Sequence, residues 1–236
     1  MRLHRFFTEE KIPTSGEFSV TNETLLNQWR NVLRMEVGKS LILFDGTGDE
    51  VLCEVVSLTK KSATLKIQER EQGVAPTRKV TLYMTLIKKD NFEMILEKAT
   101  ELGVSRIVPI ETSRTEKKGV NYERARKIVR EASEQSGRAT VPTVCEIVHI
   151  SDLSGRPGLP ESEGLVVFDP RGEKSARAFF TAGDTTPVAL LIGPEGGFTD
   201  EEMARFYSRN VHVVSMGTQI LRAETAAVVA LAMVLV

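Results

Sequence analysis

Short apolar runs separated by turn residues characterise roughly the first 70 residues of the chain. The lengths and residue types of these runs are typical of β-strands, and Asp45-Gly-Thr-Gly48 is a strong turn signal between two of them. The expected strands cover residues 18–20, 40–44, 51–57 and 63–67. One helix is expected over residues 24–34, where the apolar side chains at roughly helical spacing are Leu25, Trp29, Val32 and Leu33. The pattern predicts a small β-rich module, a partly closed barrel with one helix.

A polar segment, Glu69-Arg-Glu-Gln-Gly-Val-Ala-Pro76, separates this module from a different pattern. Beyond it, continuous runs of Val, Ile and Leu alternate with amphipathic helical segments. The expected strands cover residues 80–87, 106–110, 143–148, 165–168, 188–192 and 211–215. The expected helices cover residues 91–103, 121–137, 174–182, 200–209 and 224–236. We therefore expect two domains, 1–72 and 73–236, the second an α/β domain with a mainly parallel sheet covered on both faces.

The last expected helix is apolar all round from Ala226 to Val236. Such a helix has to be enclosed by its own fold or by a partner subunit. The run is much shorter than the about 20 residues that cross a bilayer. The amino-terminal segment 1–10 also lacks the apolar core of a signal peptide. We expect a soluble, cytoplasmic protein with no membrane partner.

Composition and charge refine this picture. The chain is 41% hydrophobic and 27% charged, which allows a sizeable core and excludes disorder. The formal net charge is −1, yet residues 75–140 carry 14 Lys and Arg against 9 Asp and Glu. A basic middle segment on an otherwise acidic chain is consistent with a face that binds RNA phosphates. Cys53 and Cys145 lie far apart with no ligand-spaced partner, so neither a metal site nor a disulfide is expected.

Two loops after predicted strands are the places to look for chemistry, because ligands of open α/β sheets bind at the carboxyl ends of the strands. The first loop is Gly193-Pro-Glu-Gly-Gly-Phe198, followed by a capping box at Thr199-Asp-Glu-Glu202. Its glycines would let backbone amides approach a ligand closely. The spacing matches neither a dinucleotide fingerprint nor a P-loop. On its own, the loop fits a simple tight turn as well as it fits a ligand site.

The second loop, 215–225, places Ile220 and Leu221 inside what should be a polar surface turn. An apolar loop with free backbone donors and acceptors suits a flat heterocycle. The alternative is that Ile220 and Leu221 plug the core while Arg222 pairs with Glu224 or Glu195.

The two loops together resemble the cofactor signature of the SPOUT, or trefoil-knot, methyltransferases. More narrowly they resemble the RsmE type, which methylates N3 of a uridine in small-subunit (16S) ribosomal RNA. Three further segments match this family in the right order. These segments are Arg2-Leu-His-Arg-Phe-Phe7, Glu97-Lys-Ala-Thr-Glu-Leu-Gly103 and Glu131-Ala-Ser-Glu-Gln-Ser-Gly-Arg138. One departure is Trp29, where the family often has His, a difference that concerns packing or RNA contact.

The resemblance implies a small amino-terminal PUA-like β-barrel that binds RNA and a carboxyl-terminal α/β trefoil-knot domain. It further implies a homodimer that uses S-adenosylmethionine, needs no metal and acts on small-subunit ribosomal RNA in the assembled subunit. The implied cofactor-binding residues are Asp169, Leu191, Ile192, Gly193, Glu195, Gly196, Met216, Gly217, Ile220, Leu221, Arg222, Glu224 and Thr225.

Methylation of uracil N3 requires loss of its proton, which places negative charge on the two flanking carbonyl oxygens. Arg222 is the first candidate to stabilise that charge and Arg138 the second. Glu195 and Glu224 are weak candidates for the base, since both have structural interpretations. The expected RNA-binding residues are Arg2, Arg5, Arg114, Lys117, Lys118, Arg124, Gln135 and Arg138.

Alternatives to this hypothesis stay open. The chain could be a non-catalytic RNA-binding or ribosome-assembly factor on the same fold, or a SPOUT methyltransferase that acts on another RNA. A nucleotide-dependent oxidoreductase is disfavoured because the chain lacks Gly-x-Gly-x-x-Gly.

Overall fold

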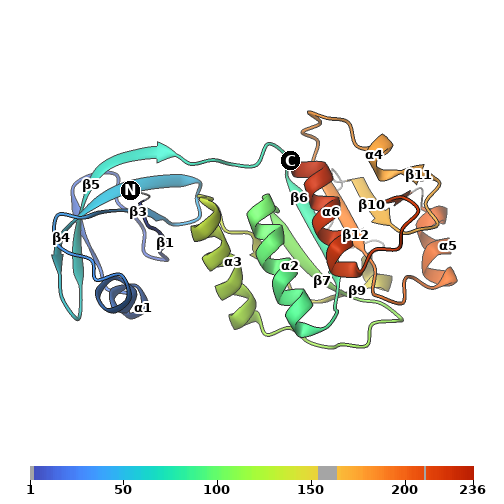
Figure 1. Cartoon of the computed structure of the whole chain (residues 1–236), viewed down its shortest axis with the longest axis horizontal. Coiled ribbons are helices and arrows are strands. Elements are labelled where there is room, and N and C mark those ends of the chain that lie inside the picture. The colour runs from blue at the N-terminus through green and yellow to red at the C-terminus, as the bar shows by residue number, and fades with distance from the viewer. Residues whose placement is uncertain (1–2, 154–163, 210) are drawn as a thin grey trace. The chain divides into compact units, whose positions relative to one another are not determined.

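The computed structural model describes residues 3–153, 164–209 and 211–236. The chain divides into two compact units. The amino-terminal unit comprises residues 1–75 together with 133–141, and the carboxyl-terminal unit comprises residues 76–132 and 142–236. Figure 1 shows the elements of both units. Arg2, one of the expected RNA contacts, lies outside the described residues.

The amino-terminal unit is built on a five-stranded sheet with the strand order β1-β3-β4-β5-β2. The strands are β1 (Arg5–Phe7), β2 (Glu17–Val20), β3 (Ser40–Phe44), β4 (Asp49–Leu58) and β5 (Ala63–Gln72). Only β1 and β3 pair in parallel, and the other neighbours are antiparallel. The register of β4 against β5 shifts at two places, which is how long strands bend around a core. β1, which the hydrophobic pattern did not predict, forms one edge.

The core of this unit shows what Trp29 does. Its side chain is fully buried and meets the Phe6 ring edge to face, with 5.5 Å between ring centroids. The expected helix over residues 24–34 is an α-helix, α1 (Glu23–Asn27), that continues as a π-helix, η1 (Gln28–Val32). The wider π turns rotate Val32 away from the core, and it is 70% exposed. The expectation that Val32 faces the core was therefore wrong.

Residues 133–141 join this unit through specific contacts. The Glu134 carboxylate accepts a hydrogen bond from the Phe7 amide at 2.9 Å, and the Gly137 carbonyl accepts one from Arg5. Gly73 packs so closely that a Cβ there would lie 2.3 Å from the Ala139 Cβ. A segment distant in sequence thereby completes the amino-terminal core.

The carboxyl-terminal unit contains an eight-stranded, entirely parallel sheet. The main path has the order β11-β13-β10-β12-β6-β7-β8, and β9 pairs with β7. The strands are β6 (Val80–Thr85), β7 (Arg106–Glu111), β8 (Thr143–Val144), β9 (Val148–His149), β10 (Gly164–Phe168), β11 (Lys174–Ser175), β12 (Val188–Ile192) and β13 (His212–Ser215). The continuous apolar runs expected of a doubly covered sheet are present, since every residue of β6 and β12 is buried.

Helices connect these strands. They are α2 (Lys89–Leu102), α3 (Tyr122–Ser136), the 3-10 helix η2 (Ile150–Leu153), α4 (Ala176–Phe179), α5 (Asp200–Ser208) and α6 (Ala223–Leu235). α6 packs against α2, and the two helices lie side by side in Figure 1. Buried alanines let α6 approach its neighbours closely, and Gly103 ends α2 in the left-handed conformation with φ 107°. No helix within the described ranges has the length and apolar character needed to cross a membrane.

Two expected elements differ from the structure. The strand expected over residues 143–148 is two short strands, β8 and β9, which pair with different parts of β7. The helix expected over residues 174–182 is a single turn, α4, preceded by β11. Both corrections concern short segments, where tertiary pairing decides the conformation and periodicity carries little information.

Candidate functional site

A hollow in the carboxyl-terminal unit lies at the carboxyl ends of β10, β12 and β13, where ligands of parallel sheets are expected. Its empty volume, including the open mouth, is about 670 Å³, within the range of small-molecule sites. Four segments line it: Phe168–Pro170, the end of β12 with the glycine-rich loop after it, the loop before α6, and the first turn of α6. The two loops that the sequence singled out therefore form one site.

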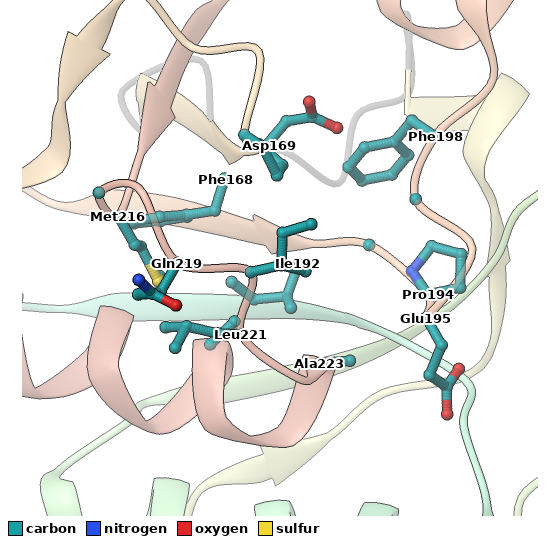
Figure 2. Close-up of a pocket in the computed structure, with 16 residues that line it drawn as sticks. Phe168, Asp169, Ile192, Pro194, Glu195, Phe198, Met216, Gln219, Leu221 and Ala223 are labelled. Carbon is teal, nitrogen blue, oxygen red and sulfur yellow. The ribbon is translucent and has the colours of Figure 1, made fainter.

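The walls of the hollow differ in chemistry (Figure 2). Met216, Gln219 and Leu221 lie on one side, and Asp169 and Phe198 lie on the other. The first wall offers mostly apolar surface and the second offers a carboxylate beside an aromatic ring. A flat heterocycle with polar groups at its edge would match both walls.

The glycine-rich loop is shaped by close packing. A Cβ at Gly193 would lie 2.9 Å from Cε2 of Phe198, a side chain that is itself buried. The next turn needs a left-handed residue at Gly197, with φ 66°. At the start of the loop the Thr85 hydroxyl donates to the Ile192 carbonyl at 2.8 Å, which fixes the end of β12 against β6. These contacts define the backbone path of the loop where it borders the hollow.

The Asp169 carboxylate accepts two hydrogen bonds from the guanidinium group of Arg171. Nε of Arg171 donates to Oδ1 at 2.7 Å and Nη2 donates to Oδ2 at 2.9 Å. Burial of Asp169 opposes its ionisation, but the hydrogen bonds and the positive charge of Arg171 outweigh burial and lower the pKa of the carboxyl. Arg171 also donates to the Phe198 carbonyl and to Asp200. It therefore links Asp169 to the backbone of Phe198, the other residue of the second wall.

The predicted capping box at the start of α5 is present. The Thr199 hydroxyl accepts from the Glu202 amide at 3.2 Å, and the Glu202 carboxylate accepts from the Thr199 amide at 2.8 Å. The other oxygen of Glu202 accepts from the Ser113 amide at 2.9 Å. This buried carboxylate therefore ties the loop after β7 to the end of the glycine-rich loop.

Many of the expected cofactor contacts meet in this hollow. Those that line it are Asp169, Ile192, Gly193, Glu195, Met216, Gly217, Ile220 and Leu221. The idea that Ile220 plugs the core is wrong, because this side chain is 87% exposed at the rim. The Glu195 side chain, although it belongs to the lining, points away from the cluster around Ile192 (Figure 2).

The remaining expected cofactor contacts lie outside the lining. Leu191 is buried in the sheet core, and the Gly196 carbonyl accepts a hydrogen bond from Arg114. Arg222 is an exposed residue at the amino-terminal cap of α6, and Glu224 and Thr225 follow it in the first turn. Within the described part of the chain, Arg222 makes no ion pair with Glu224 or Glu195. The alternative in which Arg222 only pairs with one of these carboxylates is therefore wrong.

The expected RNA contacts fall into two groups. In the amino-terminal unit Arg5 forms an ion pair with the buried Glu50, so its guanidinium holds the fold together. Arg138 is also buried there, and burial lowers its pKa to about 10. Gln135 is exposed on the last turn of α3. The carboxyl-terminal unit holds the exposed cations Arg114, Lys117, Lys118 and Arg124.

Several lining residues were missed by sequence reasoning. They are Phe168, Pro170, Pro194, Gly197, Phe198, Gln219, Ala223 and Ala226. Pro194, Gly197, Phe198 and Gln219 belong to the two loops already singled out, so naming whole loops would have found them. Ala223 also falls within the second loop, residues 215–225. Ala226 lies just beyond that loop and gave no signal, because a small residue on an apolar helix reveals neither its neighbours nor the space beside it.

Among the residues that the structure describes, no group of three or more His, Cys, Asp and Glu side chains is placed to hold a metal ion.

Comparison with known proteins adds a second line of evidence. Residues 75–235 match the family model described as RNA methyltransferase domain, and residues 30–68 match an RNA methyltransferase PUA domain. The chain is 32% identical to the ribosomal RNA small subunit methyltransferase E of Bacillus subtilis, covering 97% of this chain and 94% of the relative. It is 33% identical to the protein of the same name from Synechocystis, covering 92% and 73%.

A solved structure gives the same result. The crystal structure of a ribosomal RNA small subunit methyltransferase E from Neisseria gonorrhoeae, bound to S-adenosyl methionine, superimposes with a TM-score of 0.88. The two chains are 26% identical, and the match covers 98% of this chain and 96% of that one.

Proposed function

Because the chain belongs to the RNA methyltransferase family, we propose that it transfers a methyl group from S-adenosylmethionine to N3 of a uridine in small-subunit (16S) ribosomal RNA. Its carboxyl-terminal domain has the SPOUT α/β fold and its amino-terminal domain is PUA-like. The observation that carries the proposal is the hollow at the carboxyl ends of β10, β12 and β13, formed jointly by the two signature loops.

The residues of the hollow fit this cofactor. Ile192, Met216 and Leu221 offer apolar contacts for a purine ring, and the backbone of the glycine-rich loop offers hydrogen bonds at the ring edge. Asp169 supplies a carboxylate whose orientation Arg171 fixes. When bound, S-adenosylmethionine supplies a methyl group on a positively charged sulfur, which is the electrophile of the reaction.

We assign Arg222 the role of stabilising the uracil anion. Its guanidinium is exposed at the cap of α6, directly after the loop that lines the hollow, and no carboxylate among the described residues pairs with it. A positive charge aimed at the oxygens flanking N3 favours loss of the N3 proton and lowers the barrier. Glu195 or Glu224 would accept that proton, either directly or through water.

Arg138 is the second candidate for contact with the uracil. Its burial in the amino-terminal unit favours a structural role instead, because a buried guanidinium would need new space to reach a substrate. Arg222 is therefore the residue to test first.

We further propose that residues 1–72 form the RNA-binding domain and residues 73–236 the catalytic domain of a homodimer. The apolar last helix supports dimerisation, because Met233 is 39% exposed on it in a single chain. Because the proposed substrate is ribosomal RNA in the assembled subunit, we expect the enzyme to act in the cytoplasm. The reaction as written needs no metal.

The proposal is tested with small ribosomal subunits from a strain that lacks this protein. Wild-type protein and S-adenosylmethionine should produce 3-methyluridine, detected by mass spectrometry of the digested RNA. Arg222→Met should lower kcat about 100-fold or more at saturating concentrations of both substrates, as is typical for loss of a group that stabilises a developing anion.

The matched control is Arg177→Met on α4, which removes an exposed arginine outside the hollow. It should retain the wild-type kcat. An unchanged modification pattern with the wild-type protein would refute the proposed substrate, and an unchanged kcat for Arg222→Met would refute only the role of this residue.

A further inference from the structure

A second hollow lies in the carboxyl-terminal unit and shares no lining residue with the first. Its empty volume is also about 670 Å³. It is lined by the chain that leaves β6, the first half of α2, the loop before α3 and the first turn of α3, elements that Figure 1 shows. The floor is apolar, because Leu86, Phe92 and Leu96 line the hollow and are buried.

The rim of this hollow is positively charged. Its charged residues are Lys89, Glu93, Lys117, Lys118 and Arg124. The single carboxylate, Glu93, is already neutralised, because Arg124 lies 3.2 Å and Lys89 lies 3.8 Å from its oxygens. Among the described residues, Lys117 and Lys118 have no carboxylate partner, and both are exposed. Lys117 and Lys118 therefore place two positive charges, neutralised by no carboxylate of the described residues, at the rim of a hollow with an apolar floor.

The first turn of α3 adds to this positive charge. The Asn121 side chain accepts a hydrogen bond from the Arg124 amide at 3.0 Å, which marks the beginning of the helix beside the two lysines. The helix dipole places partial positive charge at this end. An anionic group over the rim would meet both the ammonium groups and this dipole.

Two hydrogen bonds join segments next to the second hollow to the glycine-rich loop. The Thr85 hydroxyl binds the Ile192 carbonyl, so the end of β6, which leads into the apolar floor, lies directly beside the glycine-rich loop. Arg114 donates to the Gly196 carbonyl, and Lys117 and Lys118 follow it in the same loop. The loop that contacts the glycine-rich loop at Gly196 therefore also forms part of the rim of the second hollow.

We propose that the second hollow binds a nucleotide of the RNA substrate other than the one that is methylated. Its base would lie on the apolar floor, and Lys117 and Lys118 would contact its phosphates. A nucleotide combines a flat, largely apolar ring with an adjacent fixed negative charge, which is the combination that this floor and rim present. The inference rests on the proposed function, since it assigns a subsite for the same RNA.

The first experiment measures the salt dependence of RNA affinity for Lys117→Gln/Lys118→Gln. The double variant should bind protein-free small-subunit ribosomal RNA about 10- to 30-fold more weakly at 0.15 M salt, because each lost phosphate contact reduces the slope of log K against log salt by about 0.7 to 0.9. Lys174→Gln/Arg177→Gln is the matched control, since it removes two exposed cations of the same unit outside both hollows.

The outcomes separate the inference from the proposed function. Both variants should bind S-adenosylmethionine with wild-type affinity in calorimetry, which also shows that they fold. If the wild-type protein methylates small subunits and the lysine variant matches the control in affinity and slope, only the subsite is refuted. If the wild-type protein neither binds S-adenosylmethionine nor methylates RNA, the proposed function itself fails.

A second experiment identifies what enters the hollow. Val120, which lines it, is replaced by the photoreactive residue p-benzoylphenylalanine, and the full-length protein is irradiated with unmodified small subunits. A crosslink to ribosomal RNA that weakens in the Lys117→Gln/Lys118→Gln background supports the inference. A crosslink to a ribosomal protein instead would assign the hollow to an acidic protein segment and overturn it, as would the absence of any crosslink.

Discussion

Replacing Gly193 by alanine tests whether close packing of the glycine-rich loop shapes the cofactor site. The new Cβ would lie 2.9 Å from Cε2 and 3.0 Å from Cζ of Phe198, and the shorter of the two is a distance that real Cβ atoms essentially never show. The Phe198 ring cannot simply turn aside, because it is buried and packs edge to face on Phe206 with 5.4 Å between centroids. Relief therefore has to come from a shift of the loop or of the ring, and both line the hollow.

Overpacking of this kind costs about 1–3 kcal/mol. If the substitution destabilises only the loop conformation that binds S-adenosylmethionine, the dissociation constant for this cofactor rises about 5- to 150-fold. If it destabilises the folded state as a whole, the melting temperature drops by about 2–4 °C for each kcal/mol in a protein of this size. Isothermal titration calorimetry and thermal melting measure the two effects separately.

Gly164→Ala is the matched control for this prediction. Gly164 has no left-handed conformation, and a Cβ there would meet no other described atom within 4 Å. The control should bind S-adenosylmethionine as the wild-type protein does and melt at the same temperature or slightly higher, because alanine has less freedom than glycine in the unfolded chain. The reasoning is refuted if Gly193→Ala equals Gly164→Ala in both affinity and melting temperature.

Three further predictions concern single contacts. Arg171→Met should destabilise the protein by about 1–3 kcal/mol at pH 7 because it leaves the buried Asp169 carboxylate unpaired. Since the pKa of Asp169 is lowered in the native protein, this deficit should shrink in urea titrations as the pH falls from the ordinary pKa of aspartate through the lower native pKa, and a deficit independent of pH would contradict the ion pair. Thr199→Ala should lower the stability by about 1 kcal/mol through loss of the α5 cap, whereas Thr199→Ser should be nearly neutral in the same melting assay. Arg5→Met should lower the free energy of unfolding by about 3–5 kcal/mol because it leaves the buried Glu50 carboxylate without its cation. The double variant Arg5→Met/Glu50→Gln should recover part of this loss, and equal stability of the single and double variants would show that the ion pair does not hold the fold.

The strands of the sheet core were predictable because their chemistry is local. β3 and β12 begin and end where the sequence predicted, since uninterrupted apolar runs between turn residues leave few alternatives. The cap of α5 was predictable for the same reason, because Thr199 and Glu202 contact each other within one turn.

Other features depend on contacts that no local pattern encodes. The turn of η1 is a π-helix, so Val32 points to solvent although its spacing suggested the core. The sequence predicted RNA contacts for both Arg5 and Arg138, and neither motif nor charge indicated that the fold would bury Arg138 and pair Arg5 with Glu50. Charge alone does not reveal whether a side chain reaches solvent, because burial is decided by residues distant in sequence.

The sequence by itself determined the class of the protein and singled out the two loops that line the first hollow, because motifs and periodicity are properties of neighbouring residues. Only the tertiary structure decided that these loops share one hollow, that Arg171 fixes Asp169, and that a second, basic hollow lies at the end of β6, the strand that pairs with β12. The physical reason is that a binding site is a surface made by several strand ends at once. Its shape depends on how those ends are placed together in the fold.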